Sequence, residues 1–237
     1  MKYTNYFKNH YSPLSDYQLR FASKYSTQNI LPHLLEYKND STIIEIGSWQ
    51  WKFAGFLATL WYKNHIWFEL DNDMTENLKT LFPQYQFHSS DVLEYLEKNP
   101  NSIDVLFMSH VFEHFTRENW QKLLELIYSS LKEDGIFINV MPNASSLFMA
   151  TYGRYNDVTH EVIYTENSFN HVLLNAWFNR DQVKHKNVYF VNPSWFIHII
   201  GTVFQRGMLF FMKYFLILTG YPYERITTFE ILTIAKK

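Results

Sequence analysis

Short apolar runs alternate with helical patterns through residues 42–143, and this alternation constrains the fold more than any other feature. The first run, Thr42–Ile46, is continuous and largely β-branched, which is typical of a strand in the middle of a parallel sheet. A helical pattern follows over Phe53–Tyr62. Strands that alternate with helices at this spacing predict an α/β fold with a doubly wound, mainly parallel sheet.

The same alternation continues along the chain. Further strands are predicted over His65–Leu70, Tyr85–His88, Ile103–Met108 and Ile136–Met141, and helices over Asp73–Leu81, Val92–Lys98 and Arg117–Leu131. The dipeptide Asp134-Gly135 is expected to stop the last of these helices, since glycine commonly follows a final helical turn. Residues 1–40 are predicted to be helical, with Pro13 and Pro32 as punctuation.

Composition excludes several classes of function. The chain has 237 residues, no cysteine and a formal net charge of −2. The missing cysteines exclude disulfides, a thiolate nucleophile and cysteine-ligated metal centres, and they are consistent with a reducing cytoplasm. The charge gives no reason to expect a nucleic-acid partner. The aromatic content of 19% is compatible with a large aromatic core or with a sugar-binding cleft.

One segment, Trp195–Leu218, resembles a membrane helix in composition. His198, Gln205, Arg206 and Lys213 interrupt it, whereas a span needs about 20 residues with few charges. We therefore predict no transmembrane span and expect a helical hairpin, broken near Gly201 or Gly207. Peripheral contact with the inner face of a membrane stays open. Residues 1–10 lack the apolar core of a signal peptide, so cytoplasmic localisation is expected.

Polar residues and a glycine follow the predicted strands, where ligands of such sheets bind. Gly47 allows a tight turn and a close backbone approach. Glu69, at the end of the second strand, is placed to accept both hydroxyl protons of a ribose, with Asp71 as the alternative. Asp91 is placed to accept a hydrogen from an adenine amino group. The chain has no G-x-x-x-x-G-K-[ST] motif, which disfavours phosphoryl transfer from a nucleotide.

Five segments carry a resemblance to a known family. Ile103–His114, an apolar run ending in a His-x-x-Glu-His step, and Leu131–Asn143 resemble the fourth and fifth strands of class I S-adenosylmethionine (SAM)-dependent methyltransferases. Arg154–Glu161, Tyr164–Ser168 and Leu173–Phe178 are similar to type 11 and type 23 methyltransferases of bacterial capsule and lipopolysaccharide gene clusters. A narrower similarity is to enzymes of the capsular O-methyl phosphoramidate pathway.

The resemblance implies one Rossmann-like methyltransferase domain over residues 1–237, with a seven-stranded sheet. Its expected parts are an N-terminal helical cap (1–40), a SAM-binding core (41–143) and an acceptor-side region (144–237). That last region would hold the helical hairpin, at about 194–219, and a last strand near Thr228–Ala235. The implied cofactor is SAM, with S-adenosylhomocysteine as product.

The resemblance also implies site residues. Those expected to bind the cofactor are Glu45, Gly47, Ser48, Glu69, Leu70, Asp91, Val92, Ser109 and His110. Those expected to bind a small-molecule or glycan-precursor acceptor are Asn143, Arg154, Tyr155 and His160. Arg154 suits a phosphate or carboxylate of the acceptor, and its alternative is an ion pair with Asp157 or Glu161.

An acceptor hydroxyl would need a base, because an alcohol is a poor nucleophile. His160 is the first candidate, with Asp157 orienting it, and His110 and His114 are the second. A structural role for His160 in its loop is the alternative. The order His110, Glu113, His114 resembles an inverted zinc-protease motif, but no third ligand stands out. We therefore predict no metal.

Trp49 and Trp51 occupy positions where this family usually has glycine. They leave two hypotheses open: an active methyltransferase, and a protein of the same fold that has lost SAM binding and acts as the partner of an enzyme. A homodimer or a heteromer with another methyltransferase is compatible with either, and the aromatic-rich C-terminal hairpin offers a contact surface. A nucleotide-dependent oxidoreductase is disfavoured, since the chain lacks a G-x-G-x-x-G loop.

Overall fold

The structure, a computed structural model, describes residues 15–47, 52–146, 148–220 and 225–237. Its strands are β1 (Thr42–Ile46), β2 (Asn64–Phe68), β3 (Gln86–His88), β4 (Ile103–Ser109), β5 (Leu131–Pro142), β6 (Val183–Asn187) and β7 (Glu230–Lys236). Its helices are α2 (Asp16–Asn29), α3 (Leu31–Leu34), α4 (Lys52–Thr59), α5 (Asn72–Leu81), α6 (Val92–Lys98), α7 (Arg117–Ser130), α8 (Tyr152–Tyr155), α9 (Glu166–Asn175) and α10 (Trp195–Leu218). Two 3-10 turns, η2 and η3, span Phe112–His114 and Arg180–Gln182.

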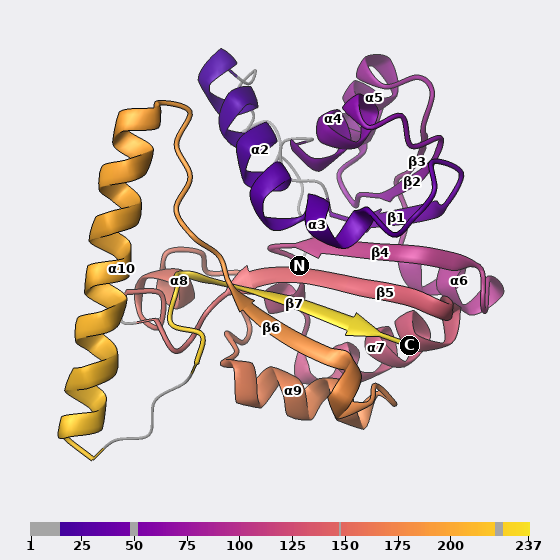
Figure 1. Ribbon diagram of the computed structural model, residues 1–237. Coiled ribbons are helices and arrows are strands. Elements are labelled where there is room, and N and C mark those ends of the chain that lie inside the picture. Colours follow the sequence, from indigo (N-terminus) through magenta and orange to yellow (C-terminus); the bar gives the residue numbers. More distant parts are fainter. Residues whose placement is uncertain (1–14, 48–51, 147, 221–224) are drawn as a thin grey trace.

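The seven strands form one sheet in the order β3-β2-β1-β4-β5-β7-β6 (Figure 1). Strands β1 to β5 pair in parallel, β7 pairs antiparallel with β5, and β6 pairs antiparallel with β7. The chain crosses from β3 back to β4 beside β1, so the strand order reverses between β1 and β4. The predicted doubly wound, mainly parallel sheet is confirmed, and its ligand-binding edge is expected at this reversal.

Helices cover both faces of the sheet (Figure 1). On one face, α6, α7 and α9 pack against alternate residues of the strands, such as Ile44, Leu106 and Phe137. On the other, α2, α3 and α4 pack against the intervening residues, such as Ile43 and Val105. Burial on both faces explains why the parallel strands are continuously apolar rather than alternating.

The predicted helix stop at Asp134-Gly135 is wrong. Helix α7 ends at Ser130, and β5 begins at once with Leu131. Between the pairs Ile103–Leu131 and Val105–Ile136, β5 carries extra residues in a bulge. A Cβ on Gly135 would lie 2.8 Å from the carbonyl oxygen of Ile103, so glycine is needed here by the bulge and not by a helix end.

The predicted helical hairpin is also wrong, because α10 is one helix of 24 residues that stands at one side of the molecule (Figure 1). Gly201 does not break it: a Cβ there would lie 2.3 Å from the Phe190 ring, so the glycine lets that ring approach the helix. A glycine costs a helix only about 1 kcal/mol. By length and composition α10 is the one candidate membrane span in the described part of the chain, and none of its residues is buried.

Candidate functional site

A cavity of about 500 Å³ opens at the carboxyl ends of β1 to β4. Its floor comes from residues that follow these strands, and the segment containing α8 forms the opposite wall. The sequence-predicted residues that line it are Gly47, Glu69, Leu70, Asp71, Asp91, Val92, Ser109, His110, His114, Asp157 and His160. The structure therefore brings most of the predicted site residues together. Ser48, Trp49 and Trp51 lie outside the described residues.

Gly47 turns the chain sharply at the end of β1. Its φ is +68°, and a Cβ at this position would lie 2.4 Å from Cγ2 of Val111. Its N–H donates to the carbonyl of Phe68 at 2.8 Å, which ties the turn to the end of β2. Backbone conformation and steric room both require glycine here, so the backbone can approach a ligand closely.

The carboxylates at this edge have different local partners. Glu69 Oε1 accepts from the N–H of Asp71 at 3.1 Å. The carboxylates of Asp71 and Asp91 instead cap helices, accepting from the N–H groups of Met74 and Leu93. This division favours Glu69 as the ribose partner.

Two apolar side chains complete this end of the cavity. Leu70 is 61% exposed and Val92 is buried, and both line the wall beside Glu69. Together they offer an apolar surface against which a planar base can pack.

The structure corrects the predicted roles of two residues, because both are buried and neither lines this cavity. Glu45 does not line this cavity: it is 3% exposed, lies 3.4 Å from His65, and borders a second cavity on the other face of the sheet. Burial raises the pKa of its carboxyl well above the usual value. Asn143, predicted to bind the acceptor, is fully buried, and its amide donates to the carbonyls of Ile226 and Thr228. Its hydrogen bonds stabilise the start of β7.

In the segment around α8, Arg154, Tyr155 and Asp157 do not make the contacts that the sequence predicted. Arg154 stacks over the ring of Tyr155, and neither residue is among the described residues that line the two cavities. Asp157 does not orient His160 through its side chain; its carboxylate accepts from the N–H and hydroxyl of Thr159, at 2.9 and 2.6 Å. Burial alone would raise the pKa of Asp157, but these hydrogen bonds lower it, so the group is ionised.

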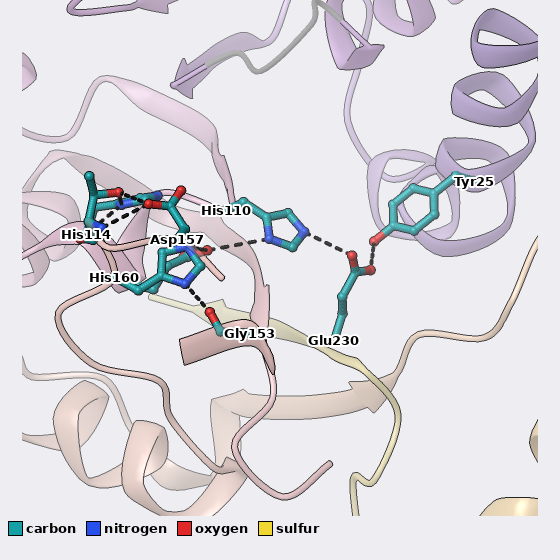
Figure 2. Close-up of polar contacts among 9 residues, drawn as sticks. Tyr25, His110, His114, Gly153, Asp157, His160 and Glu230 are labelled. Carbon is teal, nitrogen blue, oxygen red and sulfur yellow. Dashed lines mark hydrogen bonds and ion pairs between the residues drawn. The ribbon is translucent and has the colours of Figure 1, made fainter. Parts of the chain in front are cut away.

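His160 is oriented by a backbone carbonyl. Its Nδ1 bonds to the carbonyl oxygen of Gly153 at 2.5 Å, and its Nε2 lies 3.9 Å from Oε1 of Glu113 (Figure 2). Nδ1 of His114 lies 2.9 Å from the hydroxyl of Thr159. Glu113, His114 and His160 thus form one cluster. No third ligand was evident in the sequence because His160 reaches the other two only in the folded chain.

His110 links the cavity to the C-terminal strand. Its Nε2 lies 2.9 Å from Glu230, which in turn accepts from the hydroxyl of Tyr25 at 2.7 Å (Figure 2). Its Nδ1 lies 3.4 Å from Glu113. Burial alone would lower the pKa of His110, but the two carboxylates outweigh it and raise the pKa to about 10. An imidazolium has no lone pair to accept a proton, which disfavours His110 as the base.

The second cavity, of about 630 Å³, shares Gly47, Ser109 and His110 with the first. Aromatic side chains from α2, α4, β4 and α10 dominate its described wall, among them Phe21, Tyr25, Phe53, Phe107 and Phe204. Tyr25 and Glu230 were not predicted, because nothing in their local sequence marks them and only the hydrogen bond between α2 and β7 in the folded chain joins them.

Comparisons with known proteins agree with this arrangement. The sequence profile of a methyltransferase domain family matches residues 18–189, more than half of the chain. The chain belongs to this methyltransferase family. No curated protein matches its sequence.

Solved structures share the fold at low identity. A SAM-dependent methyltransferase from Archaeoglobus fulgidus has a TM-score of 0.63 at 20% identity, over 91% of this chain and 94% of that one. Phosphoethanolamine N-methyltransferase 2 of Haemonchus contortus, in complex with SAM, has a TM-score of 0.64 at 15% identity, over 100% and 60%. A complex of a methyltransferase activator and a methyltransferase from Haloferax volcanii gives 0.59 at 14% identity, over 92% and 93%.

The cofactor of this methyltransferase is SAM, and the residues present fit it. The turn at Gly47 has no room for a Cβ, and Glu69 offers a carboxylate at the end of β2. Leu70 and Val92 line the same cavity and would supply an apolar wall for the adenine. The cavity is also within the volume range of ordinary cofactor sites.

Proposed function

We propose that this methyltransferase transfers a methyl group to a hydroxyl oxygen, and that the acceptor is a surface-polysaccharide sugar, a phosphoramidate or a nucleotide-linked precursor of capsule or lipopolysaccharide. The observation that carries the proposal is the placement of His160, whose ring lines the cofactor cavity with Nδ1 held by Gly153. The resemblance of the segment Arg154–Glu161 to glycan-modifying methyltransferases supports the choice of acceptor.

The chemistry asks little of the protein. SAM supplies an electrophilic methyl group, so the chain must align the acceptor oxygen, remove its proton and exclude water. With Nδ1–H donating to a carbonyl, the neutral ring of His160 has its lone pair on Nε2, which accepts the hydroxyl proton. The new oxygen–carbon bond forms while the sulfur–carbon bond breaks, and S-adenosylhomocysteine is released.

The second cavity, whose described wall is dominated by aromatic side chains, supports a sugar acceptor. It meets the cofactor cavity at Ser109 and His110, and its aromatic faces suit the C–H surfaces of a pyranose. We propose that the acceptor enters through the second cavity and that the reaction takes place in the cytoplasm. The exposed apolar side chains of α10, such as Phe204, Phe211 and Phe215, support contact with a membrane surface or with a second chain.

Titration of the purified protein with SAM and S-adenosylhomocysteine tests whether the cofactor binds despite Trp49 and Trp51. We expect micromolar affinity, because Gly47 and Glu69 keep the geometry that the cofactor needs. Absence of heat up to millimolar cofactor would instead favour the alternative, a protein of the same fold that has lost SAM binding and supports an enzyme partner. In that case, repeating the SAM titration in the presence of a co-purified partner protein would show whether the heteromer binds the cofactor.

Replacing His160 tests the proposed chemistry. His160→Ala is expected to lower turnover about a hundredfold or more, since general base catalysis contributes on this scale. The affinity for SAM should stay nearly unchanged, because His160 comes from the segment after α8, whereas Glu69 and Gly47 come from the ends of β2 and β1. The matched control is His171→Ala, an exposed histidine of α9. Wild-type turnover in the His160→Ala variant would show that His160 takes no part in the reaction.

A further inference from the structure

Glu113, His114 and His160 each direct one ligand atom into a common space, and those atoms lie within 4.8 Å of one another. We propose that this cluster binds one divalent transition-metal cation, such as Mn²⁺ or Zn²⁺, in the wall of the cofactor cavity. The inference rests on the proposed function for its chemical purpose. It changes the role of His160 from proton acceptor to ligand.

The carboxylate of Glu113 is the first reason. Its side chain is fully buried, and neither oxygen has a hydrogen-bond partner among the described residues. The nearest cationic or imidazole atoms are Nδ1 of His110 at 3.4 Å and Nε2 of His160 at 3.9 Å, both beyond ordinary hydrogen-bond length. A buried carboxylate without hydrogen bonds is strongly disfavoured, and a metal ion would compensate it.

The orientation of the two histidines is the second reason. Nδ1 of His160 donates to the carbonyl of Gly153, which leaves Nε2 unprotonated in the neutral ring. The hydroxyl of Thr159 donates to the ionised Asp157 and therefore accepts from Nδ1 of His114. Neutral His114 then also has its lone pair on Nε2. Metal-binding histidines are commonly fixed by such outer hydrogen bonds, to a carbonyl or through a carboxylate.

The nearest positive charge, that of His110, compensates the cluster only in part. His110 is shared between Glu113, at 3.4 Å, and Glu230, at 2.9 Å, and Figure 2 shows its ring between the two, with a dashed line to each side. The cluster therefore combines one anion and two imidazole lone pairs without a donor between them. A cation completes this arrangement.

The ligand set indicates the kind of cation. Two imidazole nitrogens and one carboxylate suit first-row transition metals, whereas Mg²⁺ and Ca²⁺ prefer oxygen ligands. His114 and His160 line the cavity while Glu113 lies behind them, so the remaining coordination positions face the cavity. An oxygen of the acceptor can occupy one of them.

The bound cation would lower the pKa of the acceptor hydroxyl, whose proton then passes to water. The cation stabilises the negative charge that deprotonation leaves on the oxygen. The oxygen–carbon bond then forms as the sulfur–carbon bond of SAM breaks, and S-adenosylhomocysteine is released. No redox change is involved.

Calorimetric titration of the full chain, freed of metal with EDTA and dialysed, tests the site directly. We expect one Mn²⁺ per chain with micromolar affinity and markedly weaker binding of Mg²⁺. Glu113→Gln removes the charge, and His160→Gln removes one nitrogen ligand from a partly exposed position. Each should weaken Mn²⁺ binding by about a hundredfold or more. His171→Gln is the matched control, because His171 is an exposed histidine of α9 outside the cluster, and the Mn²⁺ affinity of this variant should be unchanged.

Thermal unfolding of every variant checks that it is folded, and His160→Gln keeps the test valid if the buried Glu113→Gln variant is not. No Mn²⁺ binding by folded wild type, or binding that both variants retain, overturns the proposal. Methyl transfer measured in parallel separates the two proposals. Methyl transfer that persists in EDTA, without bound metal, overturns the proposed cation site and leaves His160 as the base. Stoichiometric binding lost in both variants, together with no transfer to any glycan acceptor, supports the cation and contradicts the proposed function.

Discussion

Gly47→Ala is expected to abolish measurable SAM binding, with a loss of affinity of at least about a hundredfold. The added Cβ would lie 2.4 Å from Cγ2 of Val111, a stiff β-branched side chain that cannot rotate freely out of the way. The φ of +68° adds strain of about 1 kcal/mol for any residue with a Cβ. Relief of both requires the turn at the end of β1 to move, and this turn forms the cavity floor. Calorimetric titration with SAM measures the effect.

Two matched variants separate the clash from the backbone strain. Gly220 has a similar φ of +73°, but a Cβ added there would have no atom within 4 Å, so Gly220→Ala should leave SAM affinity unchanged. The double variant Gly47→Ala with Val111→Ala removes the clashing methyl and should recover part of the affinity. Equal losses in Gly47→Ala and the double variant would contradict the steric account.

The sheet was predictable because its signals are local. Strand β1 and helix α6 begin and end at the predicted residues, since a continuous apolar run marks the strand and a helical pattern marks the helix in the sequence. Strand β6 was missed because its alternating Lys184, His185 and Lys186 lack an apolar run. The hairpin and the helix stop failed for one reason: Gly201 and Gly135 were assigned to chain breaks, whereas each accommodates a neighbour distant in sequence.

The site residues also divide into those that local sequence predicts and those that it does not. Gly47, Glu69, Asp91 and Ser109 were predicted to lie together because they follow strands, and parallel strands end at one edge; all four line the first cavity. The contacts of Glu113 with His160, and of Tyr25 with His110 through Glu230, were not predictable, since they join segments far apart in the chain. Asn143 was misassigned because position after a strand does not distinguish a cavity residue from a buried one.

The second large effect concerns His110, whose imidazolium lies between two carboxylates. His110→Ala, measured in EDTA, is expected to destabilise the fold by about 3 kcal/mol, because His110 is partly exposed but its removal leaves the fully buried carboxylate of Glu113 uncompensated. His110 is the nearest cationic neighbour of that carboxylate. Urea unfolding of the wild type and the variant gives the difference in free energy.

A double-mutant cycle assigns this loss to the charge of Glu113. Adding Glu113→Gln to His110→Ala removes the uncompensated anion and should recover much of the stability, while the backbone strain at His110, with φ of +54°, is the same in both backgrounds. Glu118→Gln, on the exposed side of α7, is the control and should be additive. Mn²⁺ should stabilise His110→Ala but not the variant that also lacks Glu113, since only the former keeps the full cluster. Additive losses for His110 and Glu113 would contradict the pairing, because two groups that stabilise each other cannot contribute independently.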